Sequence, residues 1–224
     1  MDQSNTVYDT QAVSYALKGV RDVSISNALI ASATAQELLL MQSGDLTKNN
    51  YYIPFRLKSM HPDGQILKAL RKLSAGPDRH SRGRVRTDRL VLDFGHDYPT
   101  VVEWSHRAIA AAINARSVEL FKAFSSSLEK SKHQTVCTRF QFLVANQVQC
   151  IPLTQRTATV GLQLLGEFAQ KYKLKANFRN SLNDMLVLAV AIDQASHLIT
   201  YDKLLAGFAE SHLAASVSEK GDLL

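Results

Sequence analysis

The sequence lacks the features that mark three large protein classes. Its longest uninterrupted apolar run, residues 185–192, has eight residues, whereas a transmembrane helix needs about 18. The N-terminal Met-Asp-Gln-Ser-Asn has neither the basic segment nor the apolar core of a signal peptide. Two cysteines, Cys137 and Cys150, are too few for a disulfide scaffold or a four-cysteine zinc site. We therefore expect a cytoplasmic protein with reduced thiols and no membrane partner.

Glycine and proline are also scarce, with 10 and 5 residues among 224, which excludes collagen-like and linker-dominated chains. Hydrophobic residues make up 46% of the chain, an ordinary fraction for a globular protein. The length suits one domain of generous size, or a smaller domain that carries a large insertion. We predict a single domain over residues 1–224.

Positive charge is concentrated in one stretch of the chain. Residues 56–89 contain ten Lys or Arg and three Asp, a net charge of +7, against +6 for the whole protein. Such a segment attracts polyanions through counterion release, although a solvated loop would have the same composition. We interpret it as a nucleic-acid-binding segment, with an acidic protein partner as the alternative. The residues that we expect to contact substrate phosphates are Arg79, Arg82, Arg84 and Arg86.

Strands and helices alternate at both ends of the sequence. The hydrophobic pattern predicts strands at 6–9, 28–32, 140–151 and 197–201, and helices at 11–17, 34–41, 159–172 and 181–194. This alternation is typical of an α/β fold with a mainly parallel sheet. Between the two ends, the pattern predicts a short helix at 66–73, a strand at 90–94 and helix over 100–130. Residues 45–135 are therefore interpreted as an inserted helical, basic region.

Four acidic residues occupy positions where a parallel sheet could bring them together. Asp9 ends the strand predicted at 6–9, Asp202 comes directly after the strand predicted at 197–201, and Glu37 and Asp184 lie early in predicted helices. Ligands of open parallel sheets bind outside the carboxyl ends of the strands. Clustered carboxylates repel one another unless a cation lies between them, and Mg²⁺ and Mn²⁺ prefer oxygen ligands. This set suits metal-dependent phosphodiester hydrolysis, in which an ion activates water and neutralises charge on the phosphate.

Each of the four acids also fits a helix cap. Thr34 to Glu37 and Ser181 to Asp184 have capping-box spacing. Asp9 and Asp202 would serve as N-caps where a strand turns into a helix. Local pattern alone leaves capping and catalysis both open.

The residues around the acids carry a resemblance to a known family. The segments are Val7-Tyr8-Asp9-Thr10, residues 32–39 with Glu37-Leu38-Leu39, Asn183-Asp184 before an alanine-rich apolar helix, and Thr200-Tyr201-Asp202 after a short strand. In this order they resemble the PIN-domain nucleases, and among these the VapC-type ribonuclease toxins. The resemblance covers about residues 6–42 and 140–210. Typical members are much shorter, and the 45–135 region has no counterpart in them.

The resemblance implies an α/β/α sandwich with an acidic pocket that binds Mg²⁺ or Mn²⁺ and hydrolyses RNA. It assigns Asp9, Glu37, Asp184 and Asp202 to catalysis, with Asp9, Asp184 and Asp202 as metal ligands, and gives supporting roles to Thr10 and Thr200.

We expect a metal-dependent endoribonuclease, either a toxin or a stand-alone defence nuclease. The chemistry does not need the 2′-hydroxyl, so it does not by itself distinguish RNA, the expected substrate, from DNA. The alternative is a catalytically silent PIN-fold module that binds nucleic acid or protein. An antitoxin and a second copy of the chain, as a homodimer, are the protein partners considered.

Overall fold

The computed structural model describes residues 5–39, 51–52, 89–93, 101–125, 130–175 and 178–213. Its central sheet contains β1 (Thr6–Tyr8), β2 (Leu29–Ala31), β6 (Gln149–Ile151) and β7 (His197–Ile199). The strand order is β6-β2-β1-β7, and every neighbouring pair is parallel. The expected α/β class with a parallel sheet is confirmed.

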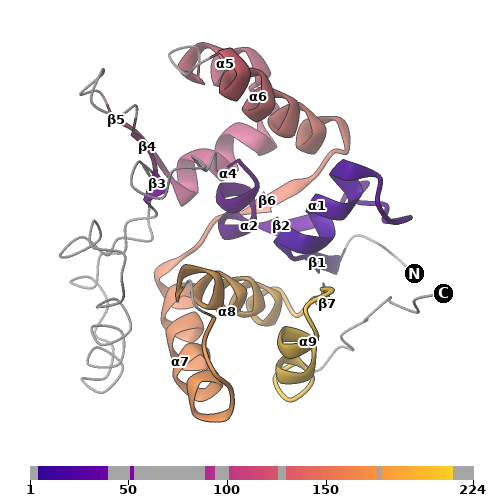
Figure 1. The fold of residues 1–224 in the computed structure, drawn as a ribbon, viewed down its shortest axis with the longest axis vertical. Coiled ribbons are helices and arrows are strands. Elements are labelled where there is room, and N and C mark those ends of the chain that lie inside the picture. The colour runs from indigo at the N-terminus through magenta and orange to yellow at the C-terminus, as the bar shows by residue number, and fades with distance from the viewer. Residues whose placement is uncertain are drawn as a thin grey trace.

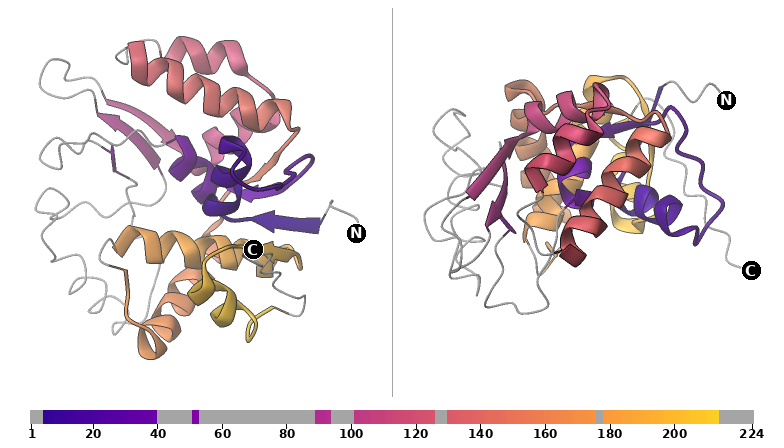
Figure 2. Two further views of the ribbon diagram at one scale, coloured as in Figure 1. Left: turned by 45° about the vertical axis from the view of Figure 1, so that its right-hand side comes forward. Right: turned by 90° about the horizontal axis from the view of Figure 1, so that it is seen from above.

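Helices cover both faces of this sheet (Figure 1). They are α1 (Thr10–Lys18), α2 (Ser32–Leu39), α4 (His106–Asn114), α5 (Val118–Ser125), α6 (Lys130–Ala145), α7 (Gln155–Lys171), α8 (Phe178–Asp193) and α9 (Lys203–Ala209). In Figure 1, α7, α8 and α9 lie below the strands, and α4, α5 and α6 lie above them. The left view in Figure 2 shows the same separation. None of the described helices is long and apolar enough to cross a membrane.

Alternation along each strand produces the two faces. Val7 and Leu198 belong to the core that α7, α8 and α9 form on one face. Their neighbours Tyr8 and Ile199 pack into the other core, with residues of α1, α4, α5 and α6. Successive side chains of a strand point to opposite faces, so three-residue strands are enough to join two helical layers.

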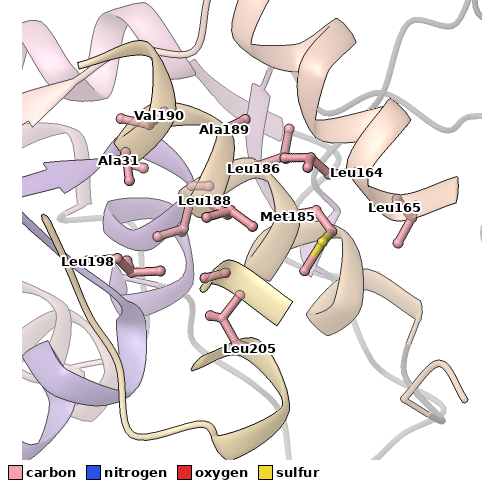
Figure 3. Close-up of a cluster of buried hydrophobic side chains, with 14 of the residues drawn as sticks. Ala31, Leu164, Leu165, Met185, Leu186, Leu188, Ala189, Val190, Leu198 and Leu205 are labelled. Carbon is pink, nitrogen blue, oxygen red and sulfur yellow. The ribbon is translucent and has the colours of Figure 1, made fainter. Parts of the chain in front are cut away.

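Helix α8 is apolar around most of its circumference because it lies between the sheet and α7. Residues 185–191 are each no more than 2% exposed. Figure 3 shows Leu188 and Val190 of α8 beside Ala31 and Leu198 of the sheet. On the far side α7 approaches closely at Gly161, where an added Cβ would lie 2.9 Å from Cδ2 of Leu186. This packing fixes the beginning of α8, which carries Asp184.

The strand order reverses its direction between β1 and β7. The chain leaves β1 through α1 and continues to β2 and β6 on one side of β1. It then returns through α7 and α8 to β7 on the other side. Such a reversal of direction leaves room for ligands outside the carboxyl ends of the two strands. The residues that follow Tyr8 and Ile199 lie at this position.

The predicted insertion differs from the expected helical region. The strands β3 (Tyr51–Tyr52), β4 (Arg89–Asp93) and β5 (Val101–Ser105) form an antiparallel sheet in the order β3-β4-β5. The helix predicted over 100–130 is therefore wrong for β5, which pairs with β4 so that Leu90 faces Trp104. Helix begins at His106, and Ile109, Ile113 and Phe121 join the core on one face of the main sheet.

The strand predicted at 140–151 is correct only at its end. Helix α6 continues to Ala145, and β6 is limited to Gln149–Ile151. Phe140 and Leu143, spaced as neighbours on a helix face, are both fully buried. The chain then turns at Gln147, whose φ of 54° is left-handed.

Most of the basic stretch lies outside the described residues. This applies to the helix predicted at 66–73 and to Arg79, Arg82, Arg84 and Arg86.

Candidate active site

Asp9 is the first residue after β1 and caps helix α1. Its Oδ1 accepts a hydrogen bond from the backbone N–H of Ala12 at 2.7 Å. Its Oδ2 accepts one from the hydroxyl of Thr200 at 2.5 Å. Asp9 is 5% exposed and lies beside the end of β7, where its N–H donates to the carbonyl of Ile199. Asp9 is therefore both a helix cap and a residue at the carboxyl ends of β1 and β7.

Glu37 is joined to the same region by Thr10. The Thr10 hydroxyl donates to Oε2 of Glu37 at 2.7 Å. Helix α2 begins at Ser32, before Thr34, and the buried Thr34 hydroxyl has no hydrogen-bond partner. The capping-box alternative for Glu37 is therefore wrong. The two threonines act on different acids, Thr200 on Asp9 and Thr10 on Glu37.

Asp184 and Asp202 are bridged by one lysine. The ammonium of Lys175 lies 2.7 Å from Oδ2 of Asp184 and 2.7 Å from Oδ2 of Asp202. Asp202 also caps α9, because its Oδ1 accepts the N–H groups of Leu204 and Leu205 at 2.9 and 3.1 Å.

Asp184 has no capping role in this arrangement. Helix α8 begins at Phe178, and Asp184 lies more than a turn into it. The Ser181 hydroxyl accepts instead from the backbone N–H of Lys175 at 3.0 Å. The predicted Ser181–Asp184 capping box is therefore wrong.

Lys175 is the residue that sequence reasoning missed. It lies in the connection between α7 and α8, where Lys173-Leu174-Lys175 looks like an ordinary solvated loop. The one available signal was indirect: clustered carboxylates need a counter-charge, and the lysines just before α8 are close in sequence to Asp184.

Burial, together with the charges of neighbouring carboxylates, raises the pKa of two acids at this site. The pKa of Asp9 is raised to about 6, first by burial and then by the charges of Asp202 and Glu37, against the opposing hydrogen bonds from Thr200 and Ala12. The pKa of Asp184 is raised to about 7, first by burial and also by Asp202 and Glu37, although Lys175 opposes the shift. The four acids therefore form one electrostatic group, called the acid pocket below.

Asp202 and Lys175 form the ionised pair of the acid pocket. Partial burial works to raise the pKa of Asp202, but Lys175 and the N–H groups of Leu204 and Leu205 outweigh it and lower the pKa. Burial works to lower the pKa of Lys175, and its hydrogen bonds to Asp184 and Asp202 outweigh that and raise it. Both groups are therefore charged at neutral pH.

The acid pocket offers carboxylate oxygens, which are the donor type that a hard divalent ion prefers. Asp9, Asp184 and Asp202 would hold such an ion, with Glu37 beside them. Within the described ranges, however, no three Asp, Glu, His or Cys side chains are grouped closely enough to hold a metal. The cation between Asp184 and Asp202 is the Lys175 ammonium.

Two other polar features of the described structure lie outside the acid pocket: a buried Ser–His pair and a polar hollow. Ser32 and Nδ1 of His106 lie 3.0 Å apart, and Ser32 also accepts from the backbone of Leu153 at 3.0 Å. Burial lowers the pKa of His106 to about 3, and Ser32 is fully enclosed, so the pair joins α2, α4 and the loop before α7. A hollow of about 390 Å³ borders Asn27, Asn114 and Gln149, near the amino ends of β2 and β6.

Protein-family models, curated proteins and solved structures contain no match to this chain. The resemblance to PIN-domain nucleases therefore stays a prediction from four short motifs. The observed parallel sheet between two helical layers is compatible with it at the level of fold class.

Proposed function

We propose that the protein is a divalent-metal-dependent nuclease of the PIN type that hydrolyses RNA at the acid pocket. The observation that carries the proposal is that Asp9, Glu37, Asp184 and Asp202, which come from separate segments, lie close enough to shift one another's pKa. Burial and mutual repulsion raise the pKa of Asp9 and Asp184, which is unfavourable for the folded protein unless a cation compensates. Strongly shifted acids in a crevice are typical of catalytic sites.

The residues have distinct tasks in this proposal. Asp9, Asp184 and Asp202 hold the ion, Thr200 orients Asp9, and Thr10 orients Glu37. When bound, the ion would activate water and neutralise charge on the phosphate. The reaction adds water across the P–O3′ bond: the hydroxyl goes to phosphorus and the proton to the leaving 3′ oxygen. Nothing in these steps uses the 2′-hydroxyl, so DNA is a second substrate to test.

The substrate needs positive charge near the acid pocket, because carboxylates repel its phosphates. The basic stretch at 56–89 supplies this charge in our proposal, with Arg79, Arg82, Arg84 and Arg86 paired to phosphate oxygens. Replacing all four by Gln should weaken binding of single-stranded RNA. The slope of log affinity against log salt should shrink by about 0.7 for each lost contact. An unchanged affinity and slope would mean that the stretch serves an acidic protein partner.

A second candidate is a catalytically silent module that binds nucleic acid or protein, such as an antitoxin or a second copy. Two observations favour it: Lys175 already neutralises part of the acid pocket, and no three-ligand metal group is formed within the described part of the chain. The two candidates differ in their response to metal. Both proposals include a cytoplasmic location, which rests on the sequence alone.

Cleavage of a mixed RNA pool with Mn²⁺ tests the nuclease proposal. The wild type should generate fragments with 3′-hydroxyl and 5′-phosphate ends, and Asp9→Asn should not. Asn caps a helix about as well as Asp, so the variant keeps α1 while it loses the charge. Equal cleavage by both proteins would point to a contaminating nuclease, and no cleavage by either would favour the silent module.

A further inference from the structure

Lys175 is held in the acid pocket by its backbone as well as by its side chain. Its N–H donates to the hydroxyl of Ser181 at 3.0 Å, and Ser181 is 1% exposed. Its ammonium then reaches Asp184 on α8 and Asp202 before α9. Two elements that are distant in sequence are therefore joined by one side chain, which itself is 35% exposed to solvent.

The ammonium occupies the position between two oxygens that an ion would also need. Oδ1 of Asp202 already accepts two backbone N–H groups at the start of α9. Only Oδ2 of Asp202 is left for a cation, and Lys175 binds that atom. The oxygen of Asp184 that binds Lys175 is likewise its Oδ2. An ion that bridges the same two oxygens would meet a positive charge in its place.

Electrostatic repulsion decides whether Lys175 and a metal ion can bind the two oxygens together or whether the ion must replace the lysine. Two cations bound to the same pair of oxygens lie within a few ångströms of each other, where like charges repel strongly outside bulk water. Lysine can leave such a position easily, because its ammonium is carried by a flexible four-carbon stem. The solvent-exposed part of the side chain gives it a direction in which to move.

We propose that Lys175 is an internal cation that competes with a divalent metal for the acid pocket. It holds Asp184 and Asp202 together in the ion-free protein and is displaced when an ion binds those oxygens. Lys175 is thus a positioning residue. It lowers the affinity of the acid pocket for metal, and it holds the carboxylates of Asp184 and Asp202 in place when no ion is bound. The inference rests on the proposed function only in taking the acid pocket as the metal site.

Titration calorimetry with Mn²⁺ tests the competition without measuring RNA cleavage. The proteins compared are the wild type, Lys175→Met, Lys175→Arg and, as a matched control, Lys173→Met at an exposed lysine of the same loop. Lys175→Met should bind Mn²⁺ at least about tenfold more tightly than the wild type, which corresponds to about 1.4 kcal/mol. Its melting temperature in EDTA should fall, because two carboxylates lose their counter-charge.

Lys175→Arg keeps the charge and should bind Mn²⁺ no more tightly than the wild type, and Lys173→Met should match the wild type. Unchanged or weaker Mn²⁺ binding by Lys175→Met would overturn the inference. If Lys175→Met does not fold, tighter binding by Lys175→Arg than by the wild type would overturn it instead. Tighter binding by Lys175→Met without RNA cleavage by any variant would keep the inference and reject the nuclease. RNA cleavage together with equal Mn²⁺ affinities of the wild type and Lys175→Met would keep the nuclease and reject the inference.

Discussion

The acid pocket has two halves that are stabilised in different ways. In one half, Asp9 and Glu37 accept hydrogen bonds from the neutral hydroxyls of Thr200 and Thr10. In the other half, Asp184 and Asp202 share the charged ammonium of Lys175. Neutral donors orient a carboxylate but leave its charge in place, whereas an ammonium neutralises it.

The pKa shifts of the three aspartates reflect the difference between the two halves of the acid pocket only in part. Asp202, paired with Lys175 and capping α9, has a lowered pKa. Asp184 has the same lysine, but its burial outweighs the effect of that lysine and raises the pKa to about 7. Asp9, which has no cationic partner among the described contacts, is raised to about 6. One lysine is therefore not enough to compensate the acid pocket, because each half keeps one carboxyl group whose pKa is raised.

The largest expected effect is stabilisation by metal. An ion that binds only the folded protein stabilises it by about 2.7 kcal/mol at a hundred times its dissociation constant. The melting temperature should rise with Mn²⁺ or Mg²⁺, and the rise should vanish in Asp9→Asn/Asp202→Asn. Differential scanning calorimetry at several ion concentrations measures both. An equal rise in the double variant would show that the ion binds elsewhere.

The Asp9 half should also make stability depend on pH. The folded pKa of about 6 lies above the usual 3.8, so the folded protein binds a proton more tightly than the unfolded chain does. The contribution of Asp9 to stability in EDTA should therefore fall as pH rises from about 4 to about 6, and Asp184, with a pKa of about 7, extends the fall to about pH 7. Asp9→Asn removes the titration and should gain about 2 kcal/mol over the wild type at pH 8 but not at pH 4.

Denaturant unfolding at pH 4, 6 and 8 checks this difference. The exposed Asp22 supplies the control, since Asp22→Asn should keep the wild-type dependence on pH. A parallel pH dependence for Asp9→Asn and the wild type would contradict the assigned pKa of Asp9.

A smaller effect separates the two threonines. Thr200 is fully buried, donates to Asp9 and accepts from the backbone N–H of Asp202 at 3.1 Å, so Thr200→Val leaves two polar groups without a partner. We expect a loss of about 1.5 kcal/mol in the free energy of unfolding. Thr10→Val removes a hydrogen bond that is only half-buried and should cost less than about 1 kcal/mol. Thermal unfolding of the two variants side by side gives the comparison, and equal losses would remove the distinction.

The strands and acids at the ends of the chain were predictable because their signals are local. Thr6–Tyr8 and His197–Ile199 are short strands, and a capping Asp follows within three residues of each. The apolar run after Asp184 reads as a buried helix from composition alone. The placement of Asp9 and Asp202 at one edge then follows from the parallel sheet.

The errors arose where distant contacts decide the structure. Val101–Ser105 has apolar residues whose spacing suits helix or strand, and its pairing with β4 selects strand. Phe140 begins an alternating segment of residues that favour strands, but it lies in helix α6. There its ring stacks on the ring of Phe121, with 4.0 Å between the two centroids. The contact of Lys175 with Asp202 spans 27 residues, and no local pattern reports it.

The Mn²⁺-dependent cleavage rate of Asp184→Asn tests the central claim most directly, because Asp184 has no capping role that could confuse the result. Asp193→Asn, at the exposed end of the same helix α8, is the matched control. We predict that Asp184→Asn loses at least about 100-fold in single-turnover RNA cleavage, with stability equal to or above that of the wild type, while Asp193→Asn keeps the wild-type rate. Full cleavage by folded Asp184→Asn would contradict the assignment of the acid pocket as the catalytic site.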